Sequence, residues 1–151
     1  MRENISIVDI AEYPAYIHFA QDYLTKDWND AKEAQEMITE SLSQKILPHL
    51  FIALEKDQFV GMALLTDDDG IDFPEKVKPW LFGLYVIRKK RRKGIGKKLI
   101  QYCIQYAKDY GFTYIYLDSV AYGDMYRKIG FEYIMDIPWK DTFTQVFRKK
   151  V

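Results

Sequence analysis

A run of six basic residues, Arg88 to Lys93, leads directly into the triplet Gly94-Ile95-Gly96. The run follows an apolar stretch at 80–87, and the triplet opens a segment whose apolar residues have helical spacing. Glycines let backbone N–H groups approach a ligand closely. The start of a helix adds unpaired N–H groups and the positive end of the helix dipole. Together with the cations, these features predict a site for a polyphosphate.

Two other interpretations of the triplet compete with a polyphosphate site. A solvated charged loop would not explain two glycines at a strand-to-helix junction. A dinucleotide site has Asp118 near the expected offset of about 20 residues. However, Leu99 replaces its third glycine, and the chain has a single predicted β-α-β unit. The Walker pattern G-x-x-x-x-G-K-[ST] has no match.

The overall composition restricts the kind of ligand. The 151 residues include 22 basic and 22 acidic ones, so the formal net charge is zero. The cations at 88–98 are therefore a local concentration, which favours a small anion and argues against nucleic acid as a partner. The length suits one domain, 1–151, and the hydrophobic fraction of 48% argues against disorder.

The cysteine count and the hydropathy pattern indicate a cytoplasmic protein. Cys103 is the single cysteine, so an internal disulfide is impossible and a reducing compartment suits the chain. We expect Cys103 to lie in the protein core, because it falls on the apolar stripe of its predicted helix. No run approaches the roughly 18 apolar residues of a membrane span, and the first residues lack the apolar core of a signal peptide. We therefore expect no membrane partner. His18 and His49 show no metal-ligand spacing, so we also expect no metal.

The elements that position the Gly-x-Gly segment follow from periodicity and turn residues. Strands are predicted at 5–9, 50–55, 59–66, 80–87, 113–119, 131–135 and 144–148. Helices are predicted at 13–24, 94–110 and 123–129, with a further one from a capping box at Asp30 and Glu33 to about Gln44. The order combines an antiparallel hairpin with one parallel crossover. We therefore expect an α/β (α+β) fold, a mixed, mostly antiparallel sheet of six or seven strands with helices on both faces.

Two motifs resemble the GNAT family of N-acetyltransferases. The hexapeptide Arg91 to Gly96 fits the family signature [RQ]-x-x-G-x-[GA], and Tyr126 to Phe131 is similar to its Tyr-x-x-x-Gly-Phe segment. The order of predicted elements also agrees, and Pro79-Trp80-Leu81 resembles a bacterial branch of the family. The specific match covers 80–131; the first half agrees only in element order.

The resemblance implies the GNAT (acyl-CoA N-acyltransferase) fold and an acetyl-CoA-dependent N-acetyltransferase. Its acceptor would be a primary amine of a small molecule or peptide, which attacks the thioester directly. The alternative is a non-catalytic acyl-CoA-binding sensor domain. The last strands offer a way to pair in a homodimer.

The resemblance also implies roles for particular residues. Backbone amides of the loop and helix start would hold the pyrophosphate of coenzyme A: Arg91, Arg92, Lys93, Gly94, Ile95, Gly96 and Lys97. Relatives often have glycine where this chain has Arg92, so only its backbone N–H need serve. Leu84, Tyr85 and Val86 would pair with the pantetheine arm, with a bulge at Gly83, and Ser119 would border the cofactor where the next strand diverges.

The resemblance assigns the proton donor but leaves the general base open. Tyr126 stands where the family has its general acid, which protonates the leaving thiolate. Many relatives carry a glutamate on the strand before the loop, whereas 80–87 contains no acid. Asp118 and Asp67 to Asp69 are the nearest candidates, acting through water. The acids of 67–75 offer a second use, attraction of a cationic acceptor.

Overall fold

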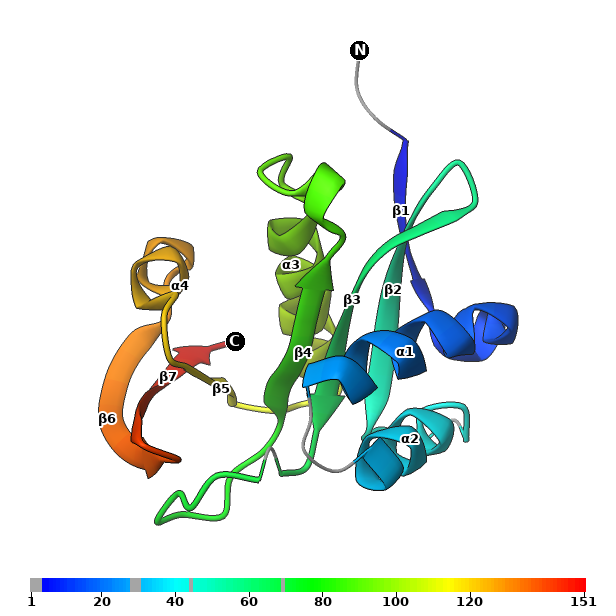
Figure 1. The fold of residues 1–151 in the computed structure, drawn as a ribbon. Coiled ribbons are helices and arrows are strands. Elements are labelled where there is room, and N and C mark those ends of the chain that lie inside the picture. The colour runs from blue at the N-terminus through cyan, green and yellow to red at the C-terminus, as the bar shows by residue number, and fades with distance from the viewer. Residues whose placement is uncertain (1–3, 28–30, 44, 69) are drawn as a thin grey trace.

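Strands and helices are interspersed along the chain in this computed structural model, which describes residues 4–27, 31–43, 45–68 and 70–151 (Figure 1). The strands are β1 (Ile5–Asp9), β2 (His49–Glu55), β3 (Gln58–Thr66), β4 (Trp80–Val86), β5 (Tyr114–Ser119), β6 (Glu132–Trp139) and β7 (Thr142–Lys150). The helices are α1 (Ile17–Asp27), α2 (Ala31–Glu40), α3 (Ile95–Asp109) and α4 (Gly123–Ile129), with 3₁₀ turns at 10–12, 14–16 and 88–90. None of the helices in these ranges has the length and apolar character that a membrane crossing requires.

One sheet holds all of these strands, in the order β1-β2-β3-β4-β5-β7-β6. Every neighbouring pair is antiparallel except β4 and β5, which run parallel. The expected mixed, mostly antiparallel sheet is therefore confirmed, with seven strands. The parallel pair corresponds to the single crossover through α3.

The β4–β5 pair separates almost at once. Its register contains one pair, Trp80 with Tyr116, and the Tyr116 N–H donates to the carbonyl of Pro79 at 3.0 Å. Beyond this point the two strands diverge. Within the part of the chain that the structure describes, the rest of β4 therefore has one edge paired with β3 and the other without a neighbouring strand.

A bulge in β4 shifts the side chains near this free edge. Tyr85 is opposite Met62 of β3, but Phe82 is opposite Leu64, so β4 has one extra residue between them. Gly83 lies within this interval with φ +64°, and a Cβ there would stand 3.1 Å from Leu24 Cδ2 of α1. Glycine thus allows both the turn of the backbone and the close approach of α1. The bulge expected at this residue is confirmed.

Helices cover both faces of the sheet, as expected (Figure 1). On one face α3 buries Ile95, Leu99, Ile100, Cys103 and Ala107 against the strands, and α4 adds Tyr126 to the same core. On the other face α1 and α2 contribute Ala20, Leu24 and Ile38. Cys103 is fully buried, which confirms its expected place in the core.

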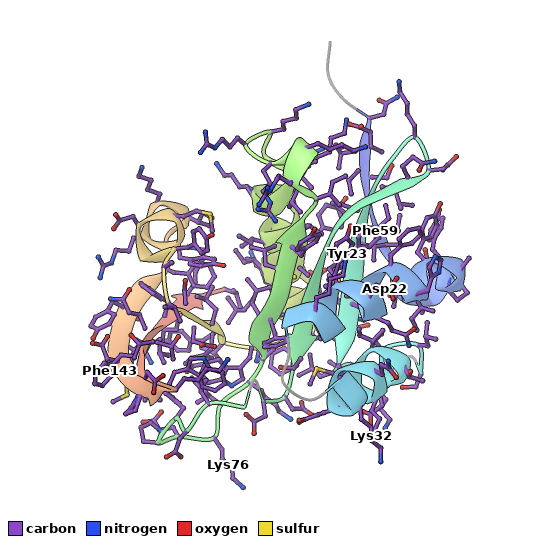
Figure 2. The ribbon with its side chains drawn as sticks, viewed as in Figure 1. Asp22, Tyr23, Lys32, Phe59, Lys76 and Phe143 are labelled. Atoms are coloured by element: carbon purple, nitrogen blue, oxygen red, sulfur yellow. The ribbon has the colours of Figure 1, made fainter. Side chains whose placement is uncertain are left out.

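An aromatic contact ties α1 to the middle of the sheet. Tyr23 of α1 stacks on Phe59 of β3, with ring centroids 5.6 Å apart, and the two side chains lie together where α1 crosses the sheet (Figure 2). The Tyr23 ring also lies 4.0 Å from the ring of Tyr85 in β4. Helix α1 therefore packs across the sheet from β3 to the bulged part of β4.

Several boundaries differ from the sequence-based expectation. The predicted helix at 13–24 begins with a 3₁₀ turn at 14–16, and α1 proper starts at Ile17. Asp30 of the predicted capping box and Gln44, the predicted helix end, lie outside the described residues. The last two strands are longer than expected. Strand β6 continues through Pro138, and β7 pairs with it from Thr142 onward. An edge strand tolerates proline, since one side of its backbone needs no partner.

Candidate active site

A cleft with a volume of about 660 Å³ lies beside the diverging end of β4. The end of β4, the basic loop, the first turn of α3 and one face of α4 form its wall, with the residues Leu84, Tyr85, Val86, Arg91, Arg92, Gly94, Ile95, Gly96, Lys97, Tyr122, Met125 and Tyr126. Segments about 40 residues apart along the chain thus meet around one space.

All of the site residues predicted from the sequence line this cleft, except Lys93 and Ser119. Lys93 is exposed in the same loop. Ser119 is buried at the end of β5, where its Oγ accepts a hydrogen bond from the backbone N–H of Tyr122 at 2.9 Å. Ser119 therefore fixes the turn that leads into α4, a role that the sequence did not suggest.

The free edge of β4 presents backbone groups to the cleft. Ile87 N donates to Val60 O of β3 at 2.9 Å. Successive residues of a strand direct their hydrogen-bonding groups to opposite sides, so the carbonyl of Val86 faces away from β3. An extended ligand with amide groups can pair with this edge as a further strand would.

Arg91 lies across this edge. Its Nε donates to the Val86 carbonyl at 2.8 Å, and its guanidinium carbon lies 5.5 Å from the centre of the Tyr85 ring. A guanidinium attracts anions and also stacks on aromatic faces. The side chain therefore has a defined position beside the cleft, whereas the sequence indicated only its backbone N–H and its charge.

The first turn of α3 presents unpaired donors to the cleft. The first hydrogen bond within the helix runs from Lys98 N to Gly94 O at 3.1 Å, so the N–H groups of Ile95, Gly96 and Lys97 precede it. The N-cap, Gly94, makes no side-chain capping bond, and this turn contains no acid. Helix starts are normally stabilised by a capping oxygen or a carboxylate. This one instead suits an anion supplied from outside the chain.

Positive φ angles shape the loop before α3. Gly94 has φ +84° and Arg92 has φ +64°. A non-glycine residue in the left-handed region costs roughly 1–2 kcal/mol, so Arg92 occupies a conformation that suits glycine better. Gly96 differs, because a Cβ there would make an ordinary contact of 3.8 Å with Val86 Cγ2. The fold itself therefore does not require glycine at residue 96.

Tyr126 lies between the cleft and the core. It is 8% exposed, and its ring lies 5.9 Å from that of Phe131 and 6.3 Å from that of Phe147. Burial first, and then the charge of Asp118 and the neighbouring Tyr122, raise the pKa of Tyr126 to about 12. Tyr126 therefore keeps its proton throughout the neutral range and is available as a donor.

Tyr122 and Met125 line the cleft beside Tyr126, and sequence reasoning missed both. Residues 122, 125 and 126 stand at i, i+3 and i+4, which places them on one face of a helix. Once Tyr126 had been identified from its motif, this spacing could have predicted that Tyr122 and Met125 line the same site.

The candidate bases lie outside the wall of the cleft. Asp118 Oδ2 accepts a hydrogen bond from Thr144 Oγ1 of β7 at 2.8 Å. Asp67 and Asp68 line a separate pocket of about 550 Å³ formed by the 67–78 loop, and Asp69 lies outside the described residues. Among the described residues that line the cleft, none carries a carboxylate. A base would have to act through solvent or from behind the wall.

Comparison with protein families and curated proteins gives two matches. The model described as "Acetyltransferase (GNAT) family" matches residues 13–131. Human N-acetyltransferase 8 is 31% identical over 88 residues, which are 54% of this chain. The match spans only 37% of the length of that relative.

Solved structures with this architecture are numerous. An aminoglycoside 6'-N-acetyltransferase complexed with coenzyme A superposes with a TM-score of 0.76 at 18% identity, over 96% of each chain. An acetyltransferase from Streptococcus agalactiae gives 0.67 at 20% identity, over 99% of this chain and 100% of the other. At these identities the likeness establishes the fold, and it confirms the fold expected from the sequence.

Proposed function

The chain belongs to the GNAT acetyltransferase family, and from this membership we propose that it transfers the acetyl group of acetyl-CoA to a primary amine. The observation that carries the proposal is the single cleft onto which the free edge of β4, the first turn of α3 and Tyr126 all face. The acceptor is a small molecule or a peptide, and the transfer is direct, without an acetylated enzyme.

The two ends of acetyl-CoA match different parts of the wall. The pyrophosphate accepts hydrogen bonds from the N–H groups of Ile95, Gly96 and Lys97, with Arg91, Arg92 and Lys93 adding positive charge. The pantetheine arm pairs with Leu84, Tyr85 and Val86 along β4. Its amide N–H would compete with Arg91 for the Val86 carbonyl, so binding frees the Arg91 guanidinium to turn toward the phosphates.

Proton transfers complete the reaction. The acceptor ammonium loses a proton to solvent, or to Asp118 through water, and the free amine attacks the thioester carbonyl. The C–N bond forms at the carbonyl carbon, the C–S bond then breaks with its electron pair leaving on sulfur, and the nitrogen gives its second proton to solvent. Tyr126 donates a hydrogen bond to the departing sulfur. A thiol has a pKa near 8.5, about 3.5 units below that of Tyr126. Tyr126 therefore acts mainly as a hydrogen-bond donor to the sulfur while negative charge develops there.

The test measures thiol release from acetyl-CoA in the presence of a panel of primary amines. The panel includes polyamines and amines that carry no further charge. The carboxylates of the 67–78 loop favour acceptors with several positive charges, so we expect the polyamines to react better. A reaction without amine corrects for hydrolysis. We expect amine-dependent release whose kcat/KM rises with pH until the acceptor itself is deprotonated.

One observation favours a second candidate, a domain that binds acyl-CoA without turnover. No carboxylate lines the cleft within the described residues, so a dedicated base is not in place. Tight acetyl-CoA binding with no turnover on any amine would establish this alternative. Failure to bind acetyl-CoA would contradict both functions.

A further inference from the structure

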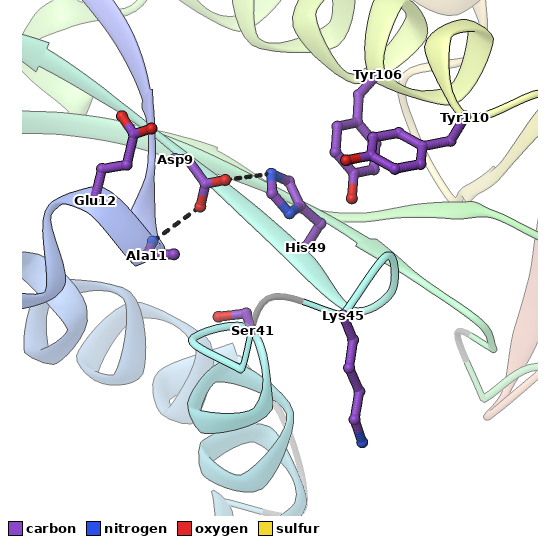
Figure 3. Close-up of a pocket in the computed structure, with 8 residues that line it drawn as sticks. All are labelled: Asp9, Ala11, Glu12, Ser41, Lys45, His49, Tyr106 and Tyr110. Carbon is purple, nitrogen blue, oxygen red and sulfur yellow. Dashed lines mark hydrogen bonds and ion pairs between the residues drawn. The ribbon is translucent and has the colours of Figure 1, made fainter.

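A second pocket, of about 230 Å³, is lined by the last turn of α3 (Figure 3), whereas the cleft is lined by the first turn of that helix. The end of β1 and its following 3₁₀ turn, the start of β2 and the last turn of α3 contribute Asp9, Glu12, His49, Tyr106 and Tyr110. The 15 residues of α3 span about 22 Å at 1.5 Å per residue, so the two sites are well separated.

His49 is the unusual feature of this second pocket. Its side chain is only 9% exposed, and its Nε2 has no hydrogen-bond partner among the described residues. Asp9 Oδ2 lies 3.1 Å away, but in a direction that does not meet the geometry of a hydrogen bond. A buried polar atom without a hydrogen bond costs about 1–3 kcal/mol. Nε2 is shielded from the pocket, so Oδ2 of Asp9 is the acceptor of this pair that a ligand can reach.

Neighbouring contacts hold these two groups in place. Asp9 Oδ1 accepts a hydrogen bond from Ala11 N at 2.8 Å, which leaves Oδ2 toward His49 (Figure 3). The His49 ring stacks on Tyr106, with centroids 4.1 Å apart and an interplanar angle of 18°. The hydroxyl of Tyr106 donates to Ile46 O at 2.7 Å. The pocket therefore has a fixed shape.

The charges around the pocket favour a cation. Burial lowers the pKa of His49, although the Asp9 carboxylate opposes that shift, so the imidazole is neutral at neutral pH. Asp9 and Glu12 supply two carboxylates, and the Lys45 side chain extends away from Asp9 and His49 (Figure 3). The rings of Tyr106 and Tyr110, 4.5 Å apart, add aromatic surface that attracts positive charge.

We propose that this pocket binds a small organic ammonium ion. The ammonium N–H donates to Asp9 Oδ2, and the alkyl groups pack against the Tyr106 and Tyr110 rings beside His49. The volume lies below the 300–1,000 Å³ of drug-sized sites, which restricts the ligand to a few carbon atoms around the nitrogen. The site is separate from the cleft, because the two share no lining residue.

The probe for this site is trimethylammonium, which has one N–H donor and forms no stable amide. Amide and imidazole NMR signals of the ¹⁵N-labelled chain are followed during titration without acetyl-CoA. We expect saturable shifts at Ala11, at Tyr106 and at the His49 ring nitrogens. Tetramethylammonium has the same charge but no N–H donor, and should bind at least about tenfold more weakly. Neutral tert-butanol should cause no saturable shift.

A pair of variants separates this site from general charge attraction. Asp9→Asn can keep its bond to Ala11 N while losing the negative charge, and should weaken trimethylammonium binding at least about tenfold. Asp109→Asn removes an exposed carboxylate from the same end of α3 and should leave binding unchanged. Equal effects of the two variants, equal binding of the two probes, or shifts confined to the cleft would each overturn the proposal. The His49 ring signals of the unmodified protein decide the question if Asp9→Asn does not fold.

Discussion

At the scale of the residue, Tyr126 illustrates what burial adds to a side chain recognised from a motif. The Tyr-x-x-x-Gly-Phe segment indicated the residue, and an ordinary tyrosine would titrate near 10. Packing against Phe131 and Phe147, with Asp118 nearby, raises the pKa to about 12. These neighbours come from β5, β7 and the residue before β6, so no local sequence pattern could have predicted the shift.

The proposed role of Tyr126 predicts a separation of turnover from binding. Tyr126→Phe removes the hydroxyl and keeps the ring, so kcat should fall about 10²-fold or more while acetyl-CoA affinity stays within about twofold. Steady-state kinetics and calorimetric titration measure the two quantities. Tyr122→Phe is the matched control, because Tyr122 lines the same cleft but is 65% exposed. Unchanged turnover in Tyr126→Phe would make Tyr126 a packing residue.

At the scale of the element, the junction of β4, the basic loop and α3 shows which features follow from local sequence. Helix α3 and its start were predictable, because the apolar spacing and the glycines are local signals. The divergence of β5 from β4 was expected only from the family resemblance, since it depends on how distant strands pack. The bond from Arg91 to Val86 O was not foreseen, because it requires the loop to fold back over its own strand.

Gly96 provides the element-scale prediction. Gly96→Val should lower acetyl-CoA affinity at least tenfold, because the added side chain would occupy the position proposed for the pyrophosphate. The fold should survive, since a Cβ meets only Val86 Cγ2 at 3.8 Å and the helix tolerates the residue. Calorimetric titration and the melting temperature report the two effects.

Gly94→Ala is the comparison variant for this experiment. Gly94 has φ +84°, so alanine there should lower the melting temperature through backbone strain. Wild-type affinity in Gly96→Val would contradict the placement of the phosphates. A melting temperature lowered as far as in Gly94→Ala would mean that residue 96 is structural.

At the scale of the whole molecule, the pocket of Asp9 and His49 shows the limit of reading a sequence. Each residue was unremarkable alone, and His49 gave no metal or catalytic spacing. The structure joins residue 9, residue 49 and residue 106 at one end of the molecule. Only the antiparallel register of β1 and β2 and the packing of α3 bring them together.

His49 predicts the direction in which stability depends on pH. Burial places the pKa of His49 below its usual value near 6.5, while the unfolded chain retains that usual value. The unfolded state therefore binds more protons as the pH falls below about 6.5, and the free energy of unfolding should decrease toward pH 5. Urea unfolding at several pH values measures this slope.

The variant His49→Gln should flatten that slope, because it removes the group that titrates differently in the two states. His18→Gln is the control, since His18 is exposed on α1. The same slope in His49→Gln as in the wild-type protein would assign the acid sensitivity to carboxylates instead.

The burial of Cys103 has a practical consequence for studying this protein. Cys103 is the one thiol in the sequence, it is fully buried in α3, and burial raises its pKa. Chromogenic disulfide reagents react with thiolates. As long as the protein stays folded, they therefore measure the coenzyme A released into solution and leave the protein unlabelled. The same reagent labels Cys103 only when the core opens. The slow labelling rate without substrates is therefore a built-in measure of how often α3 leaves the sheet.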